Sequence, residues 1–379
     1  MISFTLLFAS SAYLFFVIFQ FRDIFTAPFN HKIYEKQYNE SQWVIPHSKK
    51  PISDETLYSY AGYRYIEGLN PILLNPETPP LGKYLIGLSI KFFNNQRVIS
   101  LSFALLSLAV LFYLVYTSTA SHIQASFAVL LTSTHSLFID QIIHSPQLDI
   151  FQLFFLLILI LFFTIYGRTR RFIYLILTGI SFGAFVSIKF FLMYYAIVNA
   201  SFMLFYLLKK ERIKKAFLEF CVINLGVFFI YTLTYFQYFI LGGTIRSFLG
   251  VQKWIALFYY ASTIPTVKLI GNYLSLIFFN RWRFWTADFP VIKYQYWSIF
   301  WPIIFVLGIT SAYKLLKDKK GQRNNLVLLL LSFLIVYNIF LFITPIYPRY
   351  LLLLFVPFNI LIAIYFGQFF HRKLRNFKF

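Results

Sequence analysis

The sequence predicts an all-α, polytopic helical membrane protein that forms a single domain over residues 1–379, with about ten or more transmembrane helices. Hydrophobic residues make up 59% of the chain and charged residues only 12%, and the mean hydropathy is +0.68, outside the usual range of soluble domains. Several apolar segments are about twenty residues long, the length that an α-helix needs to cross about 30 Å of hydrocarbon. Water is therefore not the main solvent of this chain.

Ten apolar segments are expected to cross the membrane. They are residues 2–21, 98–117, 122–140, 149–166, 172–188, 190–208, 216–240, 297–315, 325–344 and 349–367. The first of them follows no basic region and ends at no small-residue cleavage site, so we expect it to remain as a span. The protein is thus expected to be a multi-pass protein of the cell membrane, the inner or plasma membrane, surrounded by membrane lipids.

Basic residues give this arrangement an orientation. The 34 Lys and Arg residues exceed the 13 Asp and Glu residues, and many lie in clusters that follow alternate spans. The clusters are Arg168–Arg171, Lys209–Lys215, Lys314–Arg323 and Arg372–Arg375. Placing them in the cytoplasm satisfies the positive-inside rule and puts two long loops, 22–97 and 241–296, together outside. No soluble basic domain is expected, which argues against a nucleic-acid partner.

The two outer loops have different patterns. Residues 81–93 are apolar at helical spacing and predict a short interfacial helix at the end of the first loop. The second loop is rich in Trp and Tyr, which suits either an aromatic belt at the membrane interface or a lining for sugar and lipid. The single cysteine, Cys221, lies in an apolar run, so we expect neither a disulfide nor a cysteine metal cluster.

Four carboxylates fall on the predicted outer side. Asp54 and Glu55 are adjacent in the first loop, Glu77 follows later in that loop, and Asp149 begins the fourth span. Three of them also have a structural interpretation. Asp54 and Glu55 could belong to a solvated loop or to a helix start that Ser53 or Asp54 caps, and Asp149 could cap its span, where the helix dipole favours a carboxylate. Taken together, they offer a base that could accept a proton from an acceptor hydroxyl.

Cations that could hold a departing phosphate occur on the same side. The candidates are Arg64, Lys83, Lys189 and Arg349, the last followed by Tyr350 at an outer helix end where a lipid phosphate would lie. Arg suits bidentate phosphate contacts, whereas Lys offers a compact charge. Lys189 has a structural alternative as well, since it could extend to the interface from between two apolar spans.

The pattern of the first loop resembles that of a known family. The matching residues are Asp54-Glu55, Tyr58, Tyr63, Tyr65-Ile66-Glu67-Gly68 and the run Glu77-Thr78-Pro79-Pro80-Leu81-Gly82-Lys83-Tyr84-Leu85. They resemble the first outer loop of the protein O-mannosyltransferases and of the related aminoarabinose transferases, two groups of GT-C-fold membrane glycosyltransferases. Looser matches follow at Arg97, Leu148-Asp149, Gly179 to Lys189 and Arg349-Tyr350.

The resemblance implies roles for several residues. Asp54 corresponds to the catalytic aspartate that acts as general base, with Glu55 as its neighbour. Glu77 stands where the aminoarabinose transferases place a carboxylate near a metal, whereas protein mannosyltransferases tend to have a histidine there. His144 occupies a position where the family often has Arg, and it could ligate a metal or be a polar boundary residue. Glu77, Asp149 and His144 are the candidate metal ligands.

The implied activity is inverting transfer of mannose or a related hexose from a polyprenyl-phosphate carrier to a hydroxyl group outside the cell. The acceptor could be a protein Ser or Thr, a lipid or an envelope glycan. A divalent metal is compatible with this chemistry, and no nucleotide cofactor is expected because the chain has no Gly-rich phosphate loop. The alternative is a lipid or sugar transporter or flippase, which predicts ionisable residues in mid-membrane and paired broken helices.

Overall fold

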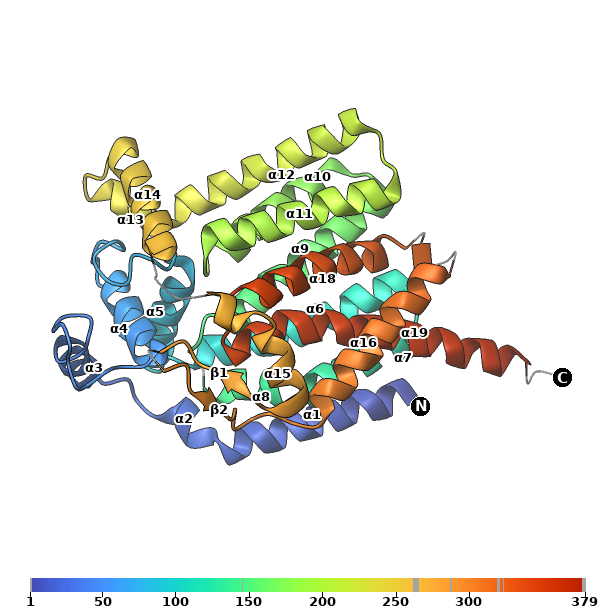
Figure 1. The fold of residues 1–379 in the computed structure, drawn as a ribbon, viewed down its shortest axis with the longest axis horizontal. Helices are drawn as coiled ribbons and strands as arrows, with labels where there is room; N and C mark the ends of the chain where they lie inside the picture. The colour runs from blue at the N-terminus through green and yellow to red at the C-terminus, as the bar shows by residue number, and fades with distance from the viewer. Residues whose placement is uncertain are drawn as a thin grey trace.

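The computed structural model describes residues 2–144, 146–261, 266–286, 288–318, 321–322 and 324–376. In this part of the chain, 8 helical segments are long and apolar enough to cross a membrane, and they pack into one bundle (Figure 1). They are α1 (Ile2–Gln20), α6 (Val98–Thr119), α9 (Asp149–Thr169), α11 (Phe191–Lys209), α12 (Ile213–Thr234), α16 (Phe300–Lys317), α18 (Asn325–Ile343), and Pro348–Gln368 in η2 (Pro348–Leu351) and α19 (Leu352–Asn376).

Two of the ten expected spans are bent or short, and a third, 216–240, is interrupted where α12 ends at Thr234. Residues 122–140 form α7 (His122–Ser133) and α8 (Ser136–Ile143), which meet at an angle of 61°. The break occurs where the His135 side chain accepts a hydrogen bond from Leu137 N and so begins a second helix. The fifth expected span is α10 (Phe172–Val186), which has only 15 residues. The predicted fold class, a polytopic all-α membrane protein, is confirmed.

Short helices fill the first long loop. They are α2 (Arg22–Thr26), α3 (His31–Asn39), α4 (Asp54–Ile66) and α5 (Leu81–Phe93), the last matching the helix predicted over 81–93. Helices α4 and α5 pack against each other, and Gly62 lies at their closest approach. A Cβ atom at Gly62 would lie 2.5 Å from the carbonyl oxygen of Lys83 and 2.9 Å from the backbone nitrogen of Gly87. This contact fixes the position of α4.

The second long loop, described above only by its aromatic composition, forms short helices and a two-stranded hairpin. The end of the expected span 216–240 forms the separate short helix α13 (Phe236–Ile240). The loop that follows contains α14 (Ile245–Ala261), η1 (Thr266–Leu269), α15 (Asn272–Phe279), β1 (Trp282–Arg283) and β2 (Val291–Ile292). The two strands form an antiparallel pair in which Trp282 faces Ile292 and Arg283 faces Val291. The sequence patterns did not predict this hairpin.

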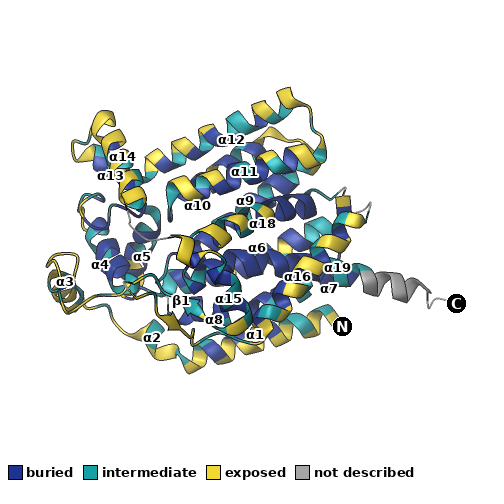
Figure 2. Cartoon of the chain, viewed as in Figure 1, coloured by how far each residue is buried: buried dark blue, intermediate teal, exposed yellow. Residues whose placement is uncertain are grey.

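Burial follows the pattern of a helical bundle in lipid. Helix α9 and the first half of α19 are mostly buried, whereas α1 carries exposed apolar side chains along most of its length (Figure 2). Large exposed residues such as Phe4, Phe8 and Phe15 would be unfavourable in water and are favourable against hydrocarbon chains.

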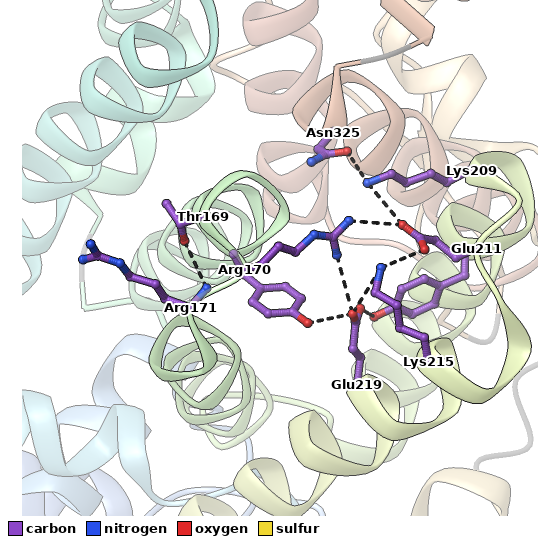
Figure 3. A network of polar contacts seen from close by, with 10 residues as sticks. Thr169, Arg170, Arg171, Lys209, Glu211, Lys215, Glu219 and Asn325 are labelled. Atoms are coloured by element: carbon purple, nitrogen blue, oxygen red, sulfur yellow. Dashed lines mark hydrogen bonds and ion pairs between the residues drawn. The ribbon is translucent and has the colours of Figure 1, made fainter.

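A polar network holds together one end of the bundle (Figure 3). The buried Glu219 accepts hydrogen bonds from Tyr166 and Tyr206 at 2.7 and 2.9 Å, and Arg170 lies 3.6 Å from it. Glu211 pairs with Lys215 at 2.8 Å and with the neighbouring Arg170 and Lys209. These residues join α9 to α11 and α12, at the end of the bundle opposite to α4, α5 and α13 (Figure 1).

Candidate active site

Four charged side chains from distant parts of the sequence meet where α4 and α9 begin. Arg349 Nη2, from η2, lies 2.5 Å from Asp54 Oδ2, and Arg349 Nε lies 3.4 Å from Asp149 Oδ2. Lys189 Nζ, from the α10–α11 connection, contacts Asp149 Oδ1 and Oδ2 at 3.0 and 3.1 Å. We call Asp54, Arg349, Asp149 and Lys189 the charge cluster. Its two carboxylates balance its two cations.

Asp54 is the member of the cluster that an incoming molecule can reach. Its side chain is 38% exposed, compared with 12% for Arg349 and 2% each for Asp149 and Lys189. Ser53 accepts the hydrogen bond from Thr56 N and is therefore the residue that caps α4. Since capping does not use the Asp54 carboxylate, that carboxylate is free to pair with Arg349.

The structure also bears on the two structural interpretations, a capping role for Asp149 and a Lys189 that extends to the membrane interface. Lys189 is buried and paired, so it does not extend to the membrane interface as the structural interpretation allowed. Asp149 is the first residue of α9, and both of its oxygens are occupied by Lys189. Burial lowers the pKa of Lys189 to about 8, while the nearby Asp149 carboxylate opposes this shift.

Aromatic rings pack around the two cations. The Lys189 ammonium lies 4.6 Å from the centre of the Tyr350 ring, and the Arg349 guanidinium lies 4.4 Å from that of Tyr347. The Tyr350 carbonyl in turn accepts a hydrogen bond from Tyr337 at 2.8 Å. Cation–π contacts of this kind stabilise cations that have left water. Tyr350 therefore lies beside Lys189 in the charge cluster.

Glu55 belongs to a second, neighbouring group of polar residues. Its Oε1 is buried and has no hydrogen-bond partner among the described residues. Burial raises the pKa of Glu55, and the charges of Arg97 and His144 oppose the shift. His144 Nδ1 lies 2.7 Å from Asp140 Oδ1, and this hydrogen bond raises the pKa of His144. Glu55 therefore contributes to this group, while its neighbour Asp54 contributes to the charge cluster.

Asp140 was not among the site residues predicted from the sequence. This buried carboxylate binds His144 through one oxygen and accepts a hydrogen bond from Tyr294 at 2.5 Å through the other. A signal was present, because an ionisable residue within an apolar span marks a candidate functional position. Tyr294 comes from the aromatic second loop, so part of that aromatic composition serves the site and not only a belt.

Lys83 is buried inside the first outer loop. Its ammonium donates to the carbonyl oxygens of Asn75 and Thr78 at 2.7 and 2.8 Å and to Asn75 Oδ1 at 3.1 Å. Burial lowers its pKa to about 7, and the nearby Glu77 opposes the shift. Because an ammonium has three donors, a contact with phosphate would require Lys83 to give up one of these bonds. Here Lys83 and Asn75, which also donates to Glu77, order the loop over residues 75–78.

Arg64 lies outside the charge cluster. It contacts the Tyr60 hydroxyl at 3.1 Å and Glu35 at 3.7 Å. Arg64 follows Asp54 by ten residues on α4, which corresponds to about 15 Å along a helix. The predicted cation set therefore divides into Arg349 and Lys189 at the charge cluster, Lys83 in the loop, and Arg64 at the far end of α4.

The three candidate metal ligands do not converge. Glu77 bonds Asn75, His144 bonds Asp140, and Asp149 bonds Lys189. Among the residues that the structure describes, no group of three or more His, Cys, Asp or Glu side chains could hold a metal ion. The side chains as placed do not fit a shared metal site, and the mechanism proposed below depends on protein groups alone.

Comparison with known proteins identifies the fold. Residues 77–236 match the family described as dolichyl-phosphate-mannose-protein mannosyltransferase. No curated protein sequence matches the chain. ArnT from Cupriavidus metallidurans superposes with a TM-score of 0.55 when bound to undecaprenyl phosphate and 0.54 in the apo state, each at 14% sequence identity.

These alignments cover 84% and 86% of this chain, but only 56% and 57% of the ArnT chain. The chain thus spans a little over half the length of that relative. AglB from Archaeoglobus fulgidus, in complex with an inhibitory peptide and a dolichol-phosphate, aligns over 79% of this chain and 44% of its own, at 14% identity and a TM-score of 0.48 that is too low to support a conclusion. This chain has a membrane fold similar to that of ArnT, a GT-C fold, and its residues 77–236 match the mannosyltransferase family that its first outer loop resembles.

Proposed function

We propose that this chain is an inverting glycosyltransferase that moves a sugar, mannose or a related hexose, from a polyprenyl-phosphate carrier to an acceptor hydroxyl. The acceptor is a protein Ser or Thr, a lipid or an envelope glycan. The observation that carries the proposal is the charge cluster, in which the accessible Asp54 carboxylate pairs with Arg349, and Asp149 joins Arg349 to the buried Lys189. The likeness to ArnT, which binds undecaprenyl phosphate, supports the carrier class.

Asp54 has the geometry of a general base. Arg349 holds its Oδ2, and no described residue donates a hydrogen bond to its Oδ1. Oδ1 is therefore placed to accept the proton of the acceptor hydroxyl, whose oxygen attacks the anomeric carbon. The bond between that carbon and the phosphate oxygen breaks, and its electron pair leaves with the phosphate. Attack opposite to the leaving group inverts the anomeric configuration.

Arg349 and Lys189 would stabilise the departing phosphate. Arg349 Nε has no hydrogen-bond partner among the described residues, although Asp149 lies 3.4 Å away. A phosphate oxygen that entered beside Arg349 would give this buried N–H group a partner. Asp149 holds both cations in place before the phosphate arrives, so little reorganisation is needed during the reaction. Burial strengthens these electrostatic interactions because water does not screen them.

The sidedness of the reaction follows from the positions of the charges. The charge cluster lies at the end of the bundle that carries α4 and α5, and the clusters Arg168–Arg171 and Lys209–Lys215 lie at the other end (Figure 1). By the positive-inside rule, those basic residues face the cytoplasm. We therefore propose that transfer occurs on the extracytoplasmic face.

Transfer of radiolabelled sugar tests this proposal. The purified full-length chain is supplied with polyprenyl-phosphate mannose, or with other polyprenyl-phosphate hexoses, and with membrane acceptors. We expect transfer by the wild type, loss of transfer in Asp54→Asn, and normal transfer in Asp23→Asn, a matched change at a side chain that is 95% exposed. If neither wild type nor control transfers any of the sugars, while the carrier crosses vesicle bilayers in its presence, the protein is a flippase.

A further inference from the structure

A cationic pocket lies on the second outer loop, apart from the charge cluster. It has a volume of about 270 Å³ and lies between η1, α15 and the β1–β2 hairpin. Lys268, Arg281 and Arg283 line it together with the polar side chains of Asn272 and Ser275. No Asp or Glu lines it in the part of the chain that the structure describes. We refer to it as the cationic pocket.

The wall of the cationic pocket is fixed by hydrogen bonds. The buried Asn272 accepts from Arg283 N at 2.9 Å and donates to Arg283 O at 2.8 Å. Arg283 Nη1 donates to the carbonyl of Lys268 at 3.0 Å. The strand is thereby joined to α15 and η1, and the Arg283 guanidinium is oriented. A cation that is already oriented loses less entropy when it binds an anion.

The charge of this pocket differs from that of the charge cluster. In the charge cluster, two carboxylates neutralise the two cations. Among the described residues, no carboxylate forms an ion pair with Lys268, Arg281 or Arg283. The pocket therefore carries an uncompensated positive charge, which favours an anionic ligand. Arg forms paired hydrogen bonds with phosphate oxygens, as it does with carboxylates.

The rim of the cationic pocket is apolar. Ile270 and Val291 line the same pocket and are exposed, as are Val267 and Phe279 on the adjoining elements. Cations beside exposed apolar side chains suit an amphiphile whose head group is anionic and whose chain lies in the membrane. A volume of about 270 Å³ suits a head group rather than a whole lipid.

The pocket is connected to the charge cluster through one short segment. Trp282, which lies between the two arginines in sequence, donates its indole N–H to the carbonyl of Ile346 at 2.9 Å. Its ring centre is 5.8 Å from that of Tyr347, and Tyr347 lies against Arg349. Residues 346–349 thus link the wall of the pocket to the cation that we assign to the leaving phosphate.

We infer that the cationic pocket is a second phosphate site, separate from the charge cluster, for the head group of a membrane-embedded reactant: either the polyprenyl-phosphate carrier before its phosphate reaches Arg349 and Lys189, or a phosphorylated lipid acceptor. That the bound lipid takes part in the reaction rests on the proposed function, which this inference deepens. Binding itself can be measured without transfer, so the two claims can fail separately.

The test is lipid binding by the full-length chain in phosphatidylcholine nanodiscs. Undecaprenyl phosphate and dioleoyl phosphatidic acid are titrated in parallel into wild type, into the triple variant Lys268→Gln, Arg281→Gln, Arg283→Gln, and into a control. The control, Lys49→Gln, Arg246→Gln, Lys253→Gln, removes the same charge from exposed positions outside the pocket. We expect the triple variant to bind at least one phosphate lipid about tenfold more weakly or worse, and the control to bind like wild type.

The pattern of losses identifies the ligand. Weakened binding of undecaprenyl phosphate alone assigns the pocket to the carrier, weakened binding of phosphatidic acid alone assigns it to a phosphorylated acceptor, and weakening of both makes it a general phosphate site. Equal losses in the triple variant and the control, or no loss in either, would overturn the inference. The single variant Lys268→Gln, at an exposed side chain, repeats the test if the triple variant folds poorly. Intact binding with absent transfer would count against the proposed function and not against the pocket.

Discussion

Asp149 is the residue on which the stability of the charge cluster depends most. Its carboxylate is 2% exposed and lies between Lys189, at 3.0 and 3.1 Å, and Arg349, at 3.4 Å. The change Asp149→Asn keeps the shape of the side chain but leaves two buried cations with only Asp54 to balance them. Breaking a buried ion pair on one side costs about 3–5 kcal/mol. We expect a loss of that size in the free energy of unfolding.

A double variant of Asp149 and Lys189 separates this electrostatic effect from a loss of packing. Lys189→Met alone removes the cation and leaves Asp149 with Arg349 as its remaining ion-pair partner. In the double variant Asp149→Asn, Lys189→Met, the remaining pair of Asp54 and Arg349 is again neutral. The double variant should therefore lose less than the sum of the two single variants, by about 0.5–3 kcal/mol. It should nevertheless transfer sugar poorly, because Lys189 no longer faces the leaving phosphate.

Equilibrium unfolding by SDS in mixed micelles, followed by circular dichroism, measures these differences. Asp23→Asn serves as the control, and we expect it to change the free energy of unfolding by less than about 0.5 kcal/mol because its side chain is exposed. Strictly additive losses in the two single variants would refute the proposed coupling. A stable Asp149→Asn single variant would show that the carboxylate does not hold the two cations.

Three further predictions concern other parts of the molecule. The hydrogen bond to Asp140 raises the pKa of His144, so this pair should stabilise the fold fully below the ordinary histidine pKa of about 6.5. The stabilisation should be lost as the pH rises through the raised pKa. His144→Gln should therefore lower the melting temperature more at acidic than at alkaline pH, and an equal shift at both would contradict this. Glu219→Gln should cost about 1.5–3 kcal/mol of unfolding free energy, because two tyrosine hydroxyls donate to that carboxylate, without changing KM for the carrier at the opposite end of the bundle. Gly62→Ala should cost about 1–3 kcal/mol and reduce transfer, because the added Cβ would push α4 and its Asp54 away from α5; unchanged activity would show that α4 tolerates the shift.

Much of the fold could be predicted because hydrophobicity along the sequence is a direct measure of what a segment does in a bilayer. The expected segment 98–117 became α6, and 325–344 became α18, with ends that differ by few residues. The bend between α7 and α8 was missed because it depends on a single side-chain hydrogen bond from Leu137 N to His135. The β1–β2 hairpin was missed because two strands of two residues leave no periodic pattern.

The candidate site was predictable in its residue types but not in its pairing. Asp149, Lys189 and Arg349 were selected as charges at the edges of apolar spans, and Asp54 as half of an acidic pair in the first outer loop that resembles a known family. The four side chains lie together. The pairing of cations with carboxylates depends on how the helices pack. Asp54 and Arg349, for example, are 295 residues apart in the sequence, and no local pattern predicts that they meet. The burial of Lys83 was hidden for the same reason, since its acceptors are backbone carbonyls of the loop.

The most direct test of the account compares carrier binding with catalysis in Asp54→Asn. Asparagine keeps the shape of the side chain but cannot accept the proton, while Arg349 and Lys189 remain to hold the phosphate. Loss of a general base typically costs about 10²–10⁴-fold in rate. The account predicts that kcat for sugar transfer falls by such a factor while undecaprenyl phosphate binds at least as tightly as to the wild type. Transfer at the wild-type rate, or loss of carrier binding in a variant that folds normally, would contradict the role of Asp54 as the base.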